Sequence, residues 1–125
     1  MSRRSVTSGA EWEERYGYRR AVRVGNVVAV SGTTAPGPDA YAQTAAALRI
    51  ALAALAELGG TPADVIRTRM FVTDIAEADE VGRAHAEAFG GHPPAATMVE
   101  VSALVAPGLR VEVEVDAVVA GEGPA

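Results

Sequence analysis

The feature that most constrains the fold is the alternation of apolar and charged residues over positions 110–117 of "RVEVEVDAVVA", residues 110–120. The apolar set is Val111, Val113, Val115 and Ala117, and the charged set is Arg110, Glu112, Glu114 and Asp116. Successive side chains of a strand point to opposite faces, so this segment predicts a strand with one apolar and one polar face. A second layer must then cover the apolar face.

Two helical stretches can supply that layer. Residues 41–58 carry leucines at helical spacing and end at Gly59-Gly60. A second helix follows Asp74 and ends at Gly90-Gly91, with an inward stripe of Ala78, Val81, His85 and Phe89. We expect both helices to pack on one face of a sheet.

The remaining segments predict the rest of that sheet. "YRRAVRVGNVVAVSG" is typical of a hairpin turning at Gly25-Asn26. Strands are also expected over 64–74 and 97–101, which makes the order ββαβαββ and the class α+β with a mixed sheet. The other face of the sheet would carry Arg67 and Arg69 beside the acids of the last strand, and we expect subunit association to bury part of it. Residues 16–120 form one domain in this interpretation, with a flexible segment over 1–15 and a tail over 121–125.

Composition excludes several chemistries. The 125 residues include no cysteine and no lysine, which rules out thiolate catalysis and a lysine Schiff base. His85 and His92 are too few for a classical zinc site unless carboxylates complete it, so no metal or cofactor is expected. A net charge of −5 disfavours nucleic acid as a partner, and no apolar run reaches the roughly 20 residues that span a membrane. A cytoplasmic protein is expected.

Five segments together resemble the RidA (YjgF) family of reactive-intermediate deaminases. They are "GYRRAVRVGNVVAVSGTT", "QTAAALRIALAALAELGG", "DVIRTRMFVTDI", "PAATMVEVSAL" and "VEVEVDAVVA", in family order between Gly17 and Ala120. The resemblance implies a chorismate-mutase-like fold and a homotrimer with clefts at its subunit interfaces. It also implies hydrolysis of small imines or enamines to a keto acid and ammonia.

One departure concerns substrate binding. Family members carry an Arg in a Pro-Ala-Arg-Ser segment, where it clamps the substrate carboxylate. The segment here is Pro94-Ala95-Ala96-Thr97, so Ala96 stands at the Arg position. Losing such a charge-assisted hydrogen bond costs roughly 1.5–3 kcal/mol of binding, which predicts an altered substrate.

Other positions match the family's pocket. By resemblance, Tyr18 would orient water or substrate, and Ser31 and Gly32 would line the substrate site. Thr97 keeps the hydroxyl of the family's Ser, and Asp116 falls where a Glu is thought to activate water. Arg83 is the most plausible relocated cation, and Arg69 is a weaker candidate.

Each assignment has a structural alternative. Tyr18 can serve as a strand anchor, Gly32 as a turn residue and Thr97 as an ordinary strand residue. Asp116 can pair with Arg67 or Arg69, and Arg83 can be a solvated helix residue. The predicted function is a RidA-like small-metabolite hydrolase, a C=N deaminase. The alternative is a non-catalytic binding or pathway-accessory protein that uses the same cleft.

Overall fold

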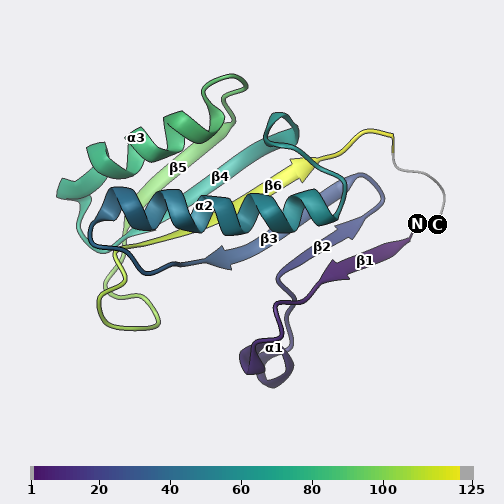
Figure 1. Ribbon diagram of the computed structural model, residues 1–125, viewed down its shortest axis with the longest axis horizontal. Helices are drawn as coiled ribbons and strands as arrows, with labels where there is room; N and C mark the ends of the chain where they lie inside the picture. The colour runs from purple at the N-terminus through teal and green to yellow at the C-terminus, as the bar shows by residue number, and fades with distance from the viewer. Residues whose placement is uncertain (1, 122–125) are drawn as a thin grey trace.

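The structure is a computed structural model that describes residues 2–121 (Figure 1). The strands are β1 (Arg3–Val6), β2 (Ala21–Val24), β3 (Val27–Thr33), β4 (Val65–Val72), β5 (Ala95–Glu100) and β6 (Val111–Val118). The helices are α1 (Glu11–Tyr16), α2 (Ala40–Glu57) and α3 (Ala78–Phe89), with 3-10 turns η1 (Pro62–Asp64) and η2 (Ile75–Glu77). From β2 onward the expected ββαβαββ order is confirmed, with strand ends shifted by one or two residues.

The strands form one six-stranded sheet in the order β1-β2-β3-β6-β4-β5. β4 and β5 are parallel and all other neighbours are antiparallel, so the expected mixed sheet is confirmed. The alternating segment forms β6, which has β3 on one side and β4 on the other. Its valines at 111, 113 and 115 are fully buried, as the alternation predicts.

Helices α2 and α3 lie side by side over one face of this sheet (Figure 1). Leu48 and Leu55 of α2 and Val81 of α3 pack on the valines of β6 in a single core. The His85 side chain lies between α3 and the sheet, where its Nε2 is 2.7 Å from Thr68 Oγ1. The prediction of two helices on one face is therefore confirmed.

The N-terminal segment differs from the expectation, because residues 1–15 were expected to be flexible and the structure forms β1 and most of α1 there. "RRSV" has no apolar alternation, but pairing with β2 uses only the backbone, from Arg3 opposite Val24 to Val6 opposite Ala21. Residue 1, and residues 122–125 of the predicted tail, lie outside the described residues.

The sheet face that α2 and α3 leave uncovered is called the open face here. Arg67, Arg69 and Phe71 of β4 lie on it, while Thr68, Met70 and Val72 are buried beneath the helices, as expected. By strand register the open face also carries several apolar side chains: Val22, Val24, Val27, Ala29, Val99 and Val118. Among residues 2–121, no helix has the length and apolar character needed to cross a membrane.

Candidate functional site

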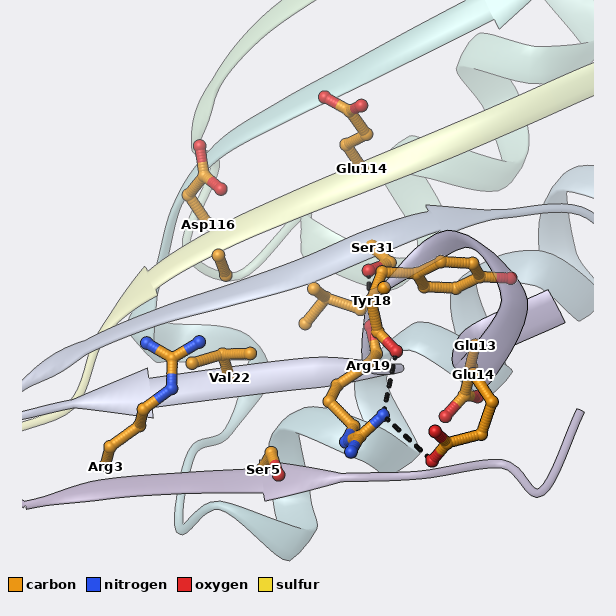
Figure 2. Close-up of a pocket in the computed structure, with 13 residues that line it drawn as sticks. Arg3, Ser5, Glu13, Glu14, Tyr18, Arg19, Val22, Ser31, Glu114 and Asp116 are labelled. Atoms are coloured by element: carbon orange, nitrogen blue, oxygen red, sulfur yellow. Dashed lines mark hydrogen bonds and ion pairs between the residues drawn. The ribbon is translucent and has the colours of Figure 1, made fainter.

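Two neighbouring hollows on the open face share Tyr18, Ser31 and Glu114 as lining residues. The first, called the Asp116 hollow, has a volume of about 770 Å³. Figure 2 shows it, with Asp116 and Glu114 extending from β6. The second, called the Glu112 hollow, has a volume of about 730 Å³ and is bounded by β3, β6, α1 and the loop before β6. Volumes of this size accommodate small metabolites.

A β-bulge in β3 shapes the boundary between the two hollows. Val30 pairs with Val115 and Thr33 pairs with Val113, so β3 advances by three residues while β6 advances by two. Ser31 and Gly32 form the bulge. A Cβ atom at Gly32 would lie only 2.5 Å from Glu112 Oε2, so glycine is required for the Glu112 carboxylate to approach the backbone.

Glu112 is the carboxylate that lies against the bulge of β3. Burial raises the pKa of Glu112, the charge of Glu114 raises it further, and the Arg20 guanidinium opposes both effects. A raised carboxyl pKa suits a group that must accept and return a proton near neutral pH. Sequence analysis did not single out Glu112, because three acids of β6 share the same alternation.

Arg20 is the second residue that sequence analysis missed. Its Nη2 donates to the carbonyl oxygens of Ser31 (2.9 Å) and Gly32 (2.8 Å), which holds the guanidinium against the bulge. Its Nε is buried and has no hydrogen-bond partner among residues 2–121. Arg20 thus places a cation in the Glu112 hollow, and the backbone carbonyl groups of the β3 bulge hold it there.

Tyr18 and Ser31, two residues of the predicted site, lie on the walls of both hollows. The Ser31 hydroxyl donates to the Arg19 carbonyl at 2.6 Å, so its oxygen remains an acceptor. Figure 2 shows Tyr18 beside Ser31, and the tyrosine ring is partly exposed. Tyr18 is therefore accessible to a ligand in either hollow.

Asp116 is engaged by Arg69, as the structural alternative proposed. Arg69 Nη1 donates to Asp116 Oδ2 at 2.9 Å and lies 3.5 Å from Glu114 Oε1. The hydrogen bond and charge of Asp116 raise the pKa of Arg69 further above its ordinary value. One oxygen of Asp116 therefore already accepts a hydrogen bond. Arg69 already interacts with two carboxylates, which compete with any anionic ligand for its guanidinium group.

The remaining predicted residues lie outside both hollows in the described chain. Thr97 is on the open face at β5, where its hydroxyl accepts from Arg67 Nη1 at 3.1 Å. Ala96 pairs with Thr68, so its side chain points to the helix-covered side. Arg83 stacks on Tyr41 of α2, with its guanidinium carbon 3.9 Å from the ring centroid. One chain therefore places Tyr18, Ser31, Gly32 and Asp116 along these two hollows, but not Ala96, Thr97 or Arg83.

Within residues 2–121, no group of three or more His, Asp or Glu side chains has a geometry that could hold a metal ion.

Comparison with known proteins identifies the family. The model of the endoribonuclease L-PSP family matches residues 10–119. The chain belongs to this family, also known as YjgF or RidA. This membership supports a small-molecule-processing protein and is consistent with a hydrolytic enzyme.

Individual relatives of this RidA-family chain agree over nearly its whole length. The crystal structure of Rv2704 from Mycobacterium tuberculosis, described as a member of the YjgF/YER057c/UK114 family, is 56% identical with a TM-score of 0.92. The match covers 94% of this chain and 100% of that one. NMB1025 from Neisseria meningitidis is 28% identical over 98% of both chains, with a TM-score of 0.83. The uncharacterized protein SCO2049 of Streptomyces coelicolor is 40% identical over 91% of this chain and 90% of its own.

Proposed function

We propose that this chain hydrolyses imines or enamines of small metabolites, releasing ammonia, in clefts between the subunits of a homotrimer. The observation that carries the proposal is that Glu112 and Arg20 line the same hollow: Glu112 is a carboxylate with a raised pKa, and Arg20 is a guanidinium fixed by two backbone carbonyl groups. Glu112 supplies acid and base catalysis, and Arg20 supplies the cation that Ala96 no longer provides.

The reaction needs one proton acceptor that becomes a proton donor. Water attacks the carbon of the protonated C=N bond while the Glu112 carboxylate takes a proton from that water, which gives a neutral carbinolamine. The protonated Glu112 then transfers this proton to the amine nitrogen, and the C–N bond breaks as the carbinolamine hydroxyl gives its proton to the Glu112 carboxylate. Glu112 finally passes that proton to the departing ammonia, so the protonated imine and water give a carbonyl compound and ammonium. Such acid–base catalysis contributes about 10²–10⁴-fold.

The electrostatic environment favours Glu112 over Asp116 for this role. Asp116 Oδ2 already accepts a hydrogen bond from Arg69, so this oxygen is engaged in an ion pair. Burial raises the pKa of Glu112, which favours the protonated form that can donate to nitrogen. The sequence-based assignment of water activation to Asp116 stays a prediction, and paired variants at the two positions decide between them.

Two features of the open face support association of several chains. Apolar side chains of four strands are left uncovered on it, which is typical of a surface that another subunit buries. In addition, Ala96 and Thr97 lie on edge strand β5, whereas Tyr18 precedes β2 near the other edge of the sheet. A neighbouring chain is the means by which both groups can contribute to one cleft.

The experiment supplies imines in situ with an amino acid oxidase and follows their loss by trapping the remainder with semicarbazide. We expect the protein to speed imine loss over buffer, Glu112→Gln to abolish the gain, and Asp116→Asn to retain most of it. Retained activity in Glu112→Gln contradicts the assignment of the base. No acceleration with any amino acid contradicts the hydrolase and leaves the alternative, a protein that binds a metabolite in the same cleft without turning it over.

A further inference from the structure

We infer that the substrate carries an aromatic or large branched apolar group, which binds against Trp12 and Tyr16 while its polar end lies at Glu112 and Arg20. This inference rests on the proposed function and names its substrate class. It assigns Trp12 and Tyr16 as specificity-determining residues of the cleft.

The two aromatic side chains form one continuous wall of the Glu112 hollow. They lie four residues apart on α1, and their rings stack with centroids 5.5 Å apart and an interplanar angle of 14°. The Arg15 guanidinium packs against both rings, 4.9 Å from the centroid of Trp12 and 5.7 Å from that of Tyr16. The aromatic side chains are nevertheless 45% and 67% exposed, which is unusual for rings of this size in a folded chain.

The wall is held rigidly, as a specificity site requires. Glu13, between the two aromatic residues, is only 2% exposed and accepts hydrogen bonds from the hydroxyls of Thr7 and Ser8. These bonds lower the pKa of Glu13 to about 2, which keeps its carboxylate charged and bound. Gly17 then ends α1 in the left-handed region at φ 77°, with its N–H donating to the Glu13 carbonyl. These contacts hold α1 against the segment that precedes it and end the helix at Gly17.

The loop between β5 and β6 adds further apolar surface to the hollow. Val105, Ala106 and Leu109 line it together with the aromatic pair. Arg20 and Glu112 line the same hollow beside the bulge of β3, so the hollow combines apolar and charged side chains. A three-carbon imino acid has no apolar group large enough to use the apolar surface. An imino acid with an aromatic or branched side chain contacts that surface while its carboxylate lies toward Arg20.

The first experiment measures binding without turnover. Trp12 is the only tryptophan of the chain, so intrinsic fluorescence reports directly on this wall. The probes are three keto acids, which correspond to hydrolysis products: pyruvate, 4-methyl-2-oxopentanoate and phenylpyruvate, with emission corrected for ligand absorbance. We expect the two larger acids to change Trp12 emission and to bind about 10- to 100-fold more tightly than pyruvate, the gain from burying one apolar side chain. Equal affinity for all three, or no binding of any, overturns the inference.

The second experiment uses variants and calorimetry. The preference is measured as the ratio of the Kd for pyruvate to the Kd for a larger keto acid. Trp12→Ala and Tyr16→Ala are each expected to reduce the logarithm of this ratio by at least about half, while the Kd for pyruvate stays unchanged. Ile75→Ala, which shortens an exposed side chain in η2 outside both hollows, is the matched control and should keep the preference. An unchanged preference in both aromatic variants overturns the inference. So does a change in oligomeric mass, because the pair would then be a subunit contact.

These outcomes separate the two claims. If the protein binds the larger keto acids preferentially but turns over no imine, the proposed hydrolase function is contradicted and the specificity role of Trp12 and Tyr16 is not. If imines derived from alanine and phenylalanine are hydrolysed with the same kcat/KM, the specificity role is contradicted and the hydrolase function is not.

Discussion

At the scale of single residues, the pKa of Glu112 links activity to stability. Burial raises that pKa in the folded chain, so the folded state holds the proton more tightly than the unfolded state does. At pH values below the pKa of the unfolded state, the Glu112 carboxyl has no effect on the free energy of unfolding. It lowers that free energy as the pH rises, first through the pKa of the unfolded state and then through the higher pKa of the folded state.

Glu112→Gln is accordingly expected to lower kcat about 10²–10⁴-fold. The same variant is expected to raise Tm at pH 7, because it removes a buried charge. At pH 3 the variant and the parent should melt at the same temperature. Thermal melts followed by circular dichroism at both pH values check this. Glu114→Gln relieves the repulsion between Glu114 and Glu112 but also removes a contact of Arg69, so it should give a smaller gain. A lower Tm for Glu112→Gln at pH 7 contradicts the sign.

The same residue shows where sequence reasoning stops. Alternation along β6 correctly predicts that Glu112, Glu114 and Asp116 share a face. It cannot rank them, because their environments depend on Arg20, Gly32 and Arg69, which come from other strands. Arg20 was missed for a related reason. It is held by the carbonyl groups of Ser31 and Gly32, and these two residues form the bulge of β3, which the sequence does not reveal.

At the scale of elements, one buried arginine connects three segments of the fold. Arg23 of β2 donates through Nε to the Gly25 carbonyl at 2.8 Å and through Nη1 to the Leu58 carbonyl, at the end of α2, at 2.6 Å. Nη2 donates to the Val119 carbonyl just after β6 at 3.3 Å. Arg23→Leu leaves these carbonyls without this donor and is expected to lower the free energy of unfolding by about 1.5–3 kcal/mol. Urea denaturation measures it, and exposed Arg49→Leu on α2 is the control.

The β1–α1 segment depends on local hydrogen bonds rather than on the core. Glu13→Gln replaces an acceptor-only carboxylate by a neutral amide, so the hydroxyls of Thr7 and Ser8 and the Ser8 N–H lose a charged partner. We expect faster amide hydrogen exchange in β1 and α1 and unchanged exchange in β6. Because the folded pKa of Glu13 is lowered to about 2, the parent should show the same loosening only as the pH falls from about 4.5 towards 2. Equal exchange in parent and variant contradicts this role.

This segment also explains the largest difference between the sequence-based fold and the structure. Period-2 and helical patterns identify elements that bury one face, and these correctly predict β2 to β6, α2 and α3. β1 is an edge strand without a buried apolar face, and α1 has six residues and no side-chain cap at Ala10. β1 is stabilised by backbone pairing with β2, and α1 is held by the Glu13 carboxylate, whose partners lie five and six residues earlier and follow no periodic rule.

At the scale of the whole molecule, the open face decides whether one chain can be a complete enzyme. Most of its charged groups lie on β6 and β4, and most of its apolar side chains lie on β2, β3 and β5. The residues of β5 lie apart from the Glu112 hollow. Helices cover only the other face. In the proposed assembly, a RidA-family chain of this shape supplies one wall of the cleft, and another copy supplies the facing wall.

The last prediction tests that assembly. Light scattering of the parent is expected to give three times the mass of the chain, and Val99→Asp, which places a charge on the open face at β5, should reduce it to one. Val99 is 42% exposed in a single chain, so the fold should survive the change by circular dichroism. Ile50→Asp introduces the same charge at a 43% exposed position of α2 and should leave the trimer intact. Loss of assembly in Val99→Asp should abolish imine hydrolysis, because the Glu112 hollow alone lacks the residues of a neighbour. A parent that scatters as one chain and still hydrolyses imines contradicts the shared cleft.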